Sequence, residues 1–356
     1  MRTPARWKLA LLSLVGVGVA GLGGWSVSTW VRFWRHDQAA RQALERRDFA
    51  EASEELRQGL ALMPGQAATL VLAAQAARRG GDLAQANRYL EAAQKAGSIP
   101  EAITLERQLG RFQSGELADA ERPLALAGEH PDNPQAALVL EAVIVGALQA
   151  MQLDMAGRAI ALWLEHRKTD VEQAQGLVWR GELALRRGNG EAALVAFREA
   201  LKLDPTSEAA HRHAAEILVR YEPRDARVHL DWLRNRLPRD RNLRLLQARC
   251  HRALGEAEAA RQLLEALLAE RPNEAQYLLE RGQVELDLGR AGEAEPWLRR
   301  AVERAPQLRD PNAALARCLR QLGKAEAAEY EQRTARIDAE IQAKIDQLFP
   351  NKKEPK

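Results

Sequence analysis

The most regular feature of the chain is a pattern of small and large apolar residues that returns about every 34 residues. In the clearest copy, from Ala174 to Ser207, small residues lead to a turn glycine, and an Ala-x3-Phe spacing then leads to a proline. A recurrence of this length indicates a chain built from repeated structural units. Prolines close four successive copies at nearly even spacing: Pro205, Pro238, Pro272 and Pro306.

Each copy predicts a hairpin of two helices. A small residue on the first helix lets the second helix approach closely, and alanine followed by a large residue on the second helix fills the gap. Glycine ends the first helix and proline ends the second. Because one hairpin cannot bury both of its apolar faces, neighbouring hairpins must stack on one another. We expect about nine hairpins over roughly residues 33–345.

The clearest copy resembles the tetratricopeptide repeat (TPR). The resemblance rests on Gly181, Ala184, Gly188, Ala193, Phe197, Ala200, Leu201 and Pro205. It implies an all-α fold, a right-handed superhelical solenoid of about nine TPR-like helical hairpins. In that family the first helices of successive hairpins line a concave groove, where extended peptides or partner helices commonly lie.

The family's groove can be projected onto these copies. The candidate groove residues are Val178, Glu182, Leu185, Arg186, Arg212, Glu216, Arg220, Leu245, Arg249, Arg252, Leu279, Gln283, Leu286, Arg317 and Arg320. A lining of arginine and leucine suits an extended protein segment with carboxylates and apolar side chains. Some family members clamp a C-terminal carboxylate with Lys and Asn, but the matching positions here carry Arg, Glu and Leu, so we do not expect that clamp.

The copies differ in quality along the chain. Residues 67–134 hold two weaker copies, and residues 135–173 hold the most divergent one, with a longer and more apolar first helix. The last copy, from near Arg309, lacks a closing proline and runs on as a charged helix. We therefore expect a tandem array over residues 33–325, a capping helix over 326–349 and a disordered tail over 350–356.

An uncharged run from Leu9 to Val31 follows a short basic tail at residues 1–8. At about 1.5 Å per residue, this run is long enough to cross a bilayer core of roughly 30 Å. Arg32 and Arg35 would stop its transfer. Tryptophans flank or end the run, as interfacial aromatic residues do: Trp7, Trp25, Trp30 and Trp34. We expect an uncleaved transmembrane helix over residues 9–32.

Two questions about this segment stay open. A cleaved signal peptide is the alternative, with an apolar stretch over Leu9–Val19 and small residues at Ser26 and Ser28 before a cut. Five positive residues just after the span against three before it do not favour export. A basic start before an apolar run is nevertheless how export signals begin, and long domains translocate largely regardless of charge. We expect the repeats outside the cytoplasm, in a bacterial periplasm, with the cytoplasmic side as the alternative.

Composition supports long helices, and the sequence contains no motif that indicates catalysis. Aromatic residues are only 5% of the chain. The 52 basic and 49 acidic side chains leave a formal charge of +3, which is too small to indicate a protein that binds polyanions. The chain has no Gly-rich phosphate loop, HExxH or GxSxG motif. His211 and His213 point to different sides of a helix and lack a third ligand. We expect no enzymatic activity, no cofactor and no metal.

The two cysteines, Cys250 and Cys318, occupy equivalent positions two repeats apart. That separation exceeds the roughly 7 Å between Cα atoms that a disulfide allows. We expect both to be buried as small hydrophobic residues.

An arginine-dense stretch runs from Arg220 to Arg252, where ten Arg face four acids, a local net charge of +6. It could bind anionic lipid headgroups, an acidic protein segment or nucleic acid. Nucleic acid is the weakest of the three, because only Tyr221 and Trp232 could stack on bases. A solvated, charged repeat surface is the simpler interpretation, and we favour it.

These features together predict a membrane-anchored scaffold or assembly factor that binds segments of other proteins in its concave groove. No small-molecule substrate is evident. The alternative is a secreted or periplasmic accessory protein, freed by signal-peptide cleavage, that binds clients as a chaperone does. Client binding predicts promiscuous affinity for apolar peptides, whereas a scaffold predicts one or two stoichiometric partners.

Overall fold

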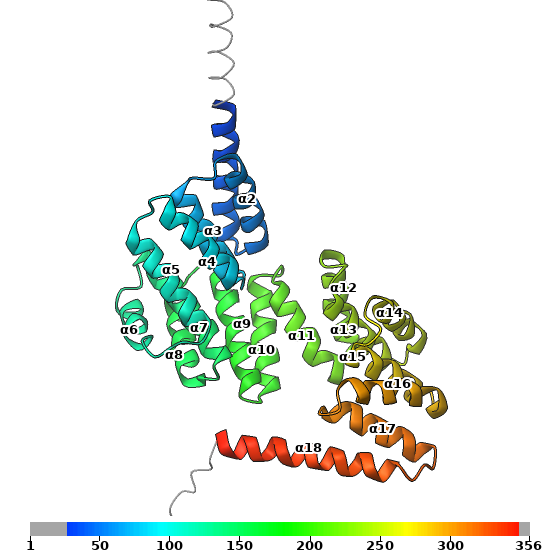
Figure 1. Ribbon diagram of the computed structural model, residues 1–356. Coiled ribbons are helices and arrows are strands. Elements are labelled where there is room, and N and C mark those ends of the chain that lie inside the picture. Colours follow the sequence, from blue (N-terminus) through cyan, green and yellow to red (C-terminus); the bar gives the residue numbers. More distant parts are fainter. Residues whose placement is uncertain (1–26, 349–356) are drawn as a thin grey trace, which may run out of the picture. The chain divides into compact units, whose positions relative to one another are not determined.

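The computed structural model describes residues 27–348, and within that range every regular element is a helix (Figure 1). A helix over residues 27–45 precedes the seventeen helices α2 to α18. These eighteen helices over the described residues are the number that nine two-helix repeats require, in agreement with the repeat pattern. They fall into two compact units that divide between Asn189 and Gly190, and each is described by itself.

The N-terminal run falls mainly outside this range. Residues 9–26 of the predicted transmembrane helix and the predicted tail over 350–356 lie outside the described residues. None of the helices between residues 27 and 348 combines the length and the apolar character needed to cross a membrane.

Unit 1 consists of stacked hairpins whose first helices pack directly on one another. Helix α3 packs on α5, α5 on α7, and α7 on α9. We call the side where these first helices meet the inner side. The helices of unit 1 are 27–45, α2 (Phe49–Leu62), α3 (Ala67–Arg79), α4 (Leu83–Lys95), α5 (Pro100–Gln113), α6 (Glu121–Glu129), α7 (Pro134–Gln149), α8 (Leu153–His166) and α9 (Asp170–Arg186).

Unit 2 repeats the same arrangement. Helix α11 packs on α13, α13 on α15, and α15 on α17, while each first helix also packs on the second helix of its own hairpin. Its helices are α10 (Gly190–Leu203), α11 (Glu208–Tyr221), α12 (Pro223–Arg236), α13 (Arg241–Ala253), α14 (Ala257–Glu270), α15 (Ala275–Asp287), α16 (Ala291–Arg304), α17 (Arg309–Gln321) and α18 (Ala327–Leu348).

Residues at equivalent positions of successive repeats have the same backbone conformation or make the same contact. Gly255, Gly289 and Gly323 follow three successive first helices, one repeat apart, and have φ values of +77°, +75° and +69°, which only glycine adopts at low cost. Both cysteines are free and buried, as predicted. Each cysteine thiol donates to the carbonyl 27 residues earlier, Cys250 to Pro223 and Cys318 to Ala291, both at 3.2 Å.

Small residues allow the close helix approach that the sequence predicts. A Cβ atom placed on Gly282 of α15 would lie 2.6 Å from Cδ2 and Cγ of Leu298, a fully buried residue of α16. Glycine is therefore required where these two helices touch, because no side chain fits between them.

The inner side of unit 1 holds a buried ionic cluster. Arg47 occupies the turn position that glycine takes one repeat later at Gly81, and it has a left-handed φ of +61°. Its guanidinium lies 2.9 Å from the carboxylate of Glu141 on α7, and Arg79 of α3 donates to the same carboxylate at 3.0 Å. All three side chains are largely excluded from water.

Aromatic rings enclose this cluster. The Arg47 guanidinium lies 5.3 Å from the ring centroids of Phe49 and Trp179 and 5.8 Å from that of Trp163. Arg79 lies 4.6 Å from the Phe49 ring. Burial alone would raise the pKa of Glu141, but the two arginines lower that pKa to about 2. The cluster thus ties the first turn of unit 1 to its fourth hairpin.

Gly282→Ala tests the close approach of α15 and α16. We expect the free energy of unfolding to fall by about 1–3 kcal/mol, because the fully buried Leu298 side chain would have to shift. Gly292→Ala is the matched control in the next helix, where nothing lies within 4 Å, and it should be neutral or stabilising by up to about 1 kcal/mol. Urea denaturation followed by circular dichroism measures both, and equal stabilities would contradict the packing described.

Glu141→Gln tests the buried cluster. The lowered pKa of Glu141 contributes stability that is present above pH 5 and lost as the pH falls toward 2. The variant should therefore unfold about 3 kcal/mol more easily at pH 7, and the difference should shrink between pH 5 and pH 2.

Glu121→Gln, which removes an exposed partner of Arg158 in the same unit, is the control and should change stability by less than about 1 kcal/mol at any pH. A pH-independent difference between wild type and Glu141→Gln would contradict an ionised, buried Glu141.

Candidate functional site

A concavity of about 780 Å³ lies on the inner side of unit 2. It is formed by α11, α13 and α15, the turn after α13 and the start of α17. The structure brings six of the predicted groove residues together in its lining: Glu216, Arg220, Arg249, Arg252, Leu279 and Gln283. This concavity is the candidate site.

Three large apolar side chains contribute to the lining of the concavity, and two of them, Leu246 and Leu279, are largely buried. Val219 of α11, Leu246 of α13 and Leu279 of α15 stand on three successive first helices and face the same space. Val219 is not among the predicted groove residues, and the repeat pattern predicts Leu245 where Leu246 lines the concavity. A repeat pattern sets the helix face only to within one residue, so it could not separate these two leucines.

An ionic network forms one wall. The Nε atom of Arg249 lies 2.6 Å from Glu280, a buried carboxylate of α15. Arg252 lies 3.3 Å from the other oxygen of Glu280 and 2.8 Å from Asp287. These arginines therefore already have partners, and they fix the register of α13 against α15. Sequence reasoning missed Glu280 and Asp287, whose link to the arginines is visible only after folding.

Arg220 differs from the other lining arginines. It is exposed at the end of α11, and it forms no ion pair with any residue of the described chain. The lining as a whole holds three arginines against four acids, a net charge of −1, with Glu216 and Asp310 completing the acids. The concavity is thus not a general anion site, and a partner carboxylate finds one free guanidinium there.

The other predicted groove residues lie elsewhere. Leu245 and Leu286 are buried in the core of unit 2, because each first helix is covered by both its own hairpin and its neighbours. Arg212 pairs with Asp240 at 2.7 Å, Arg320 pairs with Glu331, and Arg317 is exposed outside the concavity.

The four predicted residues of α9 belong to unit 1. Val178 is buried, contrary to its expected place in a groove, because α9 packs on α7 and α8. Glu182 and Leu185 are half-buried. The Nε atom of Arg186 donates to the Leu148 carbonyl at 2.7 Å, so this side chain holds α9 to α7.

Most arginines of the stretch from Arg220 to Arg252 are already paired, three of them with acids of the next repeat and four within their own repeat. Seven of its ten arginines pair with acids: Arg227 with Glu256, Arg234 with Asp231, Arg236 with Glu208, Arg241 and Arg244 with Glu270, Arg249 with Glu280, and Arg252 with Glu280 and Asp287. Six of the seven use acids outside the stretch, so the local charge of +6 counted along the sequence is largely neutralised in the fold.

The histidines are part of the packing. His211 lies on Trp232 with ring centroids 4.1 Å apart, and its Nδ1 atom lies 2.9 Å from Nδ1 of His229. Burial lowers the pKa of both histidines, and the neighbouring His211 lowers the pKa of His229 further. Between residues 27 and 348, no group of three His, Cys, Asp or Glu side chains could hold a metal ion.

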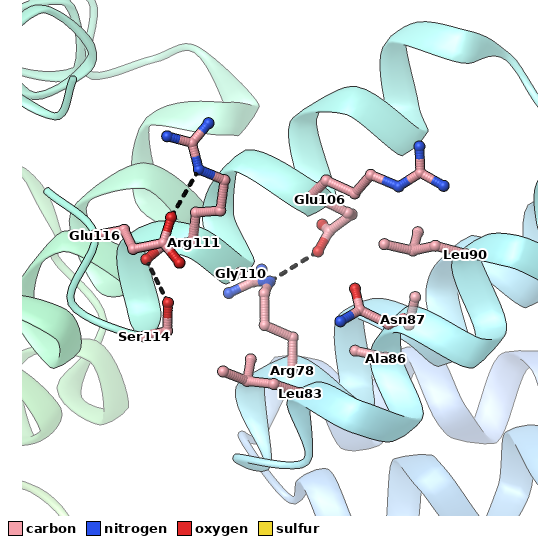
Figure 2. Close-up of a pocket in the computed structure, with 12 residues that line it drawn as sticks. Arg78, Leu83, Ala86, Asn87, Leu90, Glu106, Gly110, Arg111, Ser114 and Glu116 are labelled. Atoms are coloured by element: carbon pink, nitrogen blue, oxygen red, sulfur yellow. Dashed lines mark hydrogen bonds and ion pairs between the residues drawn. The ribbon is translucent and has the colours of Figure 1, made fainter. Parts of the chain in front are cut away.

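Unit 1 offers a much smaller hollow. A pocket of about 210 Å³ lies between α3, α4 and α5, and Figure 2 shows Arg78 reaching across it toward Glu106. The Arg78 Nε atom donates to Glu106 at 2.8 Å, and Nη1 donates to Gln113 at 3.2 Å. Since Arg78 and Glu106 are buried and paired with each other, they act as a clamp between repeats.

Comparison with known proteins identifies the repeats. The family model for the tetratricopeptide repeat matches residues 147–208 and 245–308. No curated protein sequence is significantly similar to the chain.

The chain is also similar to a number of solved structures. A thermophilic TPR protein of Thermus thermophilus is 23% identical, with 49% of this chain and 100% of that one aligned at a TM-score of 0.42. PilW, a type IV pilus biogenesis factor, is 19% identical over 66% of this chain and 96% of its own, with a TM-score of 0.45. Yeast Tom70 is 13% identical over 98% of each chain, with a TM-score of 0.37.

Similarities at these TM-scores carry no argument about function. The match to the family model, together with the stacked hairpins and their turn glycines, supports one statement: the chain contains tetratricopeptide repeats.

Proposed function

We propose that this protein is an interaction scaffold that binds a segment of another protein in the concavity of unit 2. The observation that supports the proposal is the unpaired guanidinium of Arg220 in the same concavity as the apolar side chains of Val219, Leu246 and Leu279. A charge-assisted hydrogen bond from arginine to a carboxylate sets the position of a ligand, and burial of apolar side chains supplies affinity. The expected ligand is an extended segment with an acidic residue next to apolar ones.

The contrast with unit 1 also supports the proposal. The inner side of unit 1 is occupied by Arg47, Arg79 and Glu141, which are held by one another and by aromatic rings. A partner would have to displace a buried ion pair to bind there, and separating such a pair costs several kcal/mol. The inner side of unit 2 needs no such rearrangement.

The scaffold is further proposed to be tethered to a membrane by its N-terminal segment, with the repeats outside the cytoplasm. The support is the uncharged run from Leu9 to Val31 in the sequence, bounded by basic residues. The helix over residues 27–45 passes from the end of this run directly into the core of unit 1, where Ala40 and Ala43 are buried. Little chain is left between the run and the first hairpin.

Arg220→Glu tests the binding site. The full chain would be screened against an array of random twelve-residue peptides, and we expect enrichment of Asp or Glu adjacent to leucine or aromatic residues. Loss of the Arg220 contact should weaken the enriched peptides about tenfold to a hundredfold, as expected for one hydrogen bond to a charged group.

Arg224→Glu is the matched control, because Arg224 is also exposed and unpaired among the described residues but does not line the concavity. It carries the same change of charge and should bind as the wild type does. Equal weakening by both substitutions, or broad binding of apolar peptides without acidic preference, would argue against the proposed site.

A further inference from the structure

The helix over residues 27–45 carries an apolar stripe that faces away from the protein. Its four large residues stand at i, i+3, i+4 and i+7 and are unusually exposed: Val27 62%, Trp30 56%, Val31 37% and Trp34 51%. At 100° per residue these positions span about 100° of the helix surface. We call Val27, Trp30, Val31 and Trp34 the aromatic stripe.

The opposite face of the same helix is the packed one. Phe33 and His36 lie against Gly59 of α2, and the His36 ring bonds to Glu55 at 2.7 Å. Ala40 and Ala43, one and two turns further on, are fully buried. The aromatic stripe is therefore not the edge of the core, and nothing in the described residues covers it.

Two arginines lie at the level of the stripe along the helix: Arg35 borders it, and Arg32 stands on another side of the helix. Arg32 and Arg35 are exposed, and neither forms an ion pair with any described residue. Nearby basic side chains differ in this respect, since Arg41 pairs with Asp37, Arg46 with Glu51 and Arg47 with Glu141. Free positive charge beside tryptophan is the combination that suits the headgroup layer of an anionic membrane.

We infer that the aromatic stripe, with Arg32 and Arg35, seats the first helix of unit 1 in the interfacial layer of a membrane that contains anionic lipid. The inference rests on the proposed tether. It adds the class of lipid in the membrane and the residues that contact this lipid. The uncharged run of the sequence ends at Val31, inside the stripe, so a membrane is already expected at this level of the chain.

A second copy of the chain fits the stripe less well. Two tryptophans and two valines at these exposures offer about 400 Å², whereas a stable dimer buries about 800 Å² on each partner. Tryptophan also prefers the interface itself, because its ring is apolar and its N–H group needs a polar partner.

The position of the stripe has a mechanical consequence. Trp34 and the first fully buried residue, Ala40, are six residues apart on one continuous helix, which is about 9 Å. The first hairpin of unit 1 therefore stands at the membrane surface on a rigid support, without a flexible linker.

The test uses the full chain reconstituted into phosphatidylcholine vesicles with and without phosphatidylglycerol, floated on a density gradient. Lipids with bromine near the headgroup quench tryptophans at that depth. All variants carry Trp7→Phe and Trp25→Phe, which removes the other two tryptophans expected at the membrane. In this background we expect Trp30→Phe with Trp34→Phe to remove most of the quenching.

We also expect brominated phosphatidylglycerol to quench more strongly than brominated phosphatidylcholine. Arg32→Gln with Arg35→Gln should reduce this preference by about twentyfold. Arg46→Gln, which removes a paired arginine of the same unit, should leave the preference unchanged.

The outcomes separate the inference from the tether. If the chain floats but its quenching does not depend on Trp30 and Trp34, the inference is wrong and the tether stands. Failure of the chain to float would overturn the tether and the inference with it. Self-association in detergent that is lost on removing both tryptophans would assign the stripe to a second copy and so overturn the inference.

Discussion

The stacking of each hairpin on the next is the interaction on which the rest of the structure depends. No hairpin of about 30 residues can bury both of its apolar faces, so the core exists only between neighbours. Close contact is possible because glycine stands where helices touch, as at Gly282 against Leu298. The ion pairs between repeats, such as Arg212 with Asp240 and Arg249 with Glu280, then select one register among those that apolar packing alone would accept.

The two units use the same stacking with different results on their inner sides. In unit 1 a turn glycine is replaced by Arg47, whose backbone takes a strained left-handed conformation and whose side chain reaches Glu141, 94 residues away. The strain costs about 1–2 kcal/mol, which the buried ion pair and the surrounding rings offset. In unit 2 the turns after α13, α15 and α17 keep their glycines, and a concavity lined by Val219, Leu246 and Leu279 lies on the inner side. The same repeat thus yields a filled inner side in one unit and a proposed binding surface in the other.

Much of the fold could be predicted from the sequence because its determinants are local. The repeat period places turn glycines, closing prolines and small residues within one hairpin, and the number of helices in the described chain follows from it. The candidate site was harder, since Leu245 and Leu246 differ by one residue in helix phase and only the second reaches the concavity. The acidic partners of Arg249 and Arg252 come from the next repeat, and the acidic partner of Arg47 lies three hairpins later. A count of charges along the sequence therefore overestimates the number of unpaired arginines.

The central claim is that partners bind the inner side of unit 2. Site-specific photo-crosslinking in living cells tests it most directly, with the crosslinker placed at Val219 or Gln283 in the concavity and at Val195, an exposed residue of α10 outside it. The account predicts that Val219 and Gln283 trap the same one or two proteins and that Val195 traps neither. Crosslinks from Val195 alone, or a different set of proteins from each position, would contradict it.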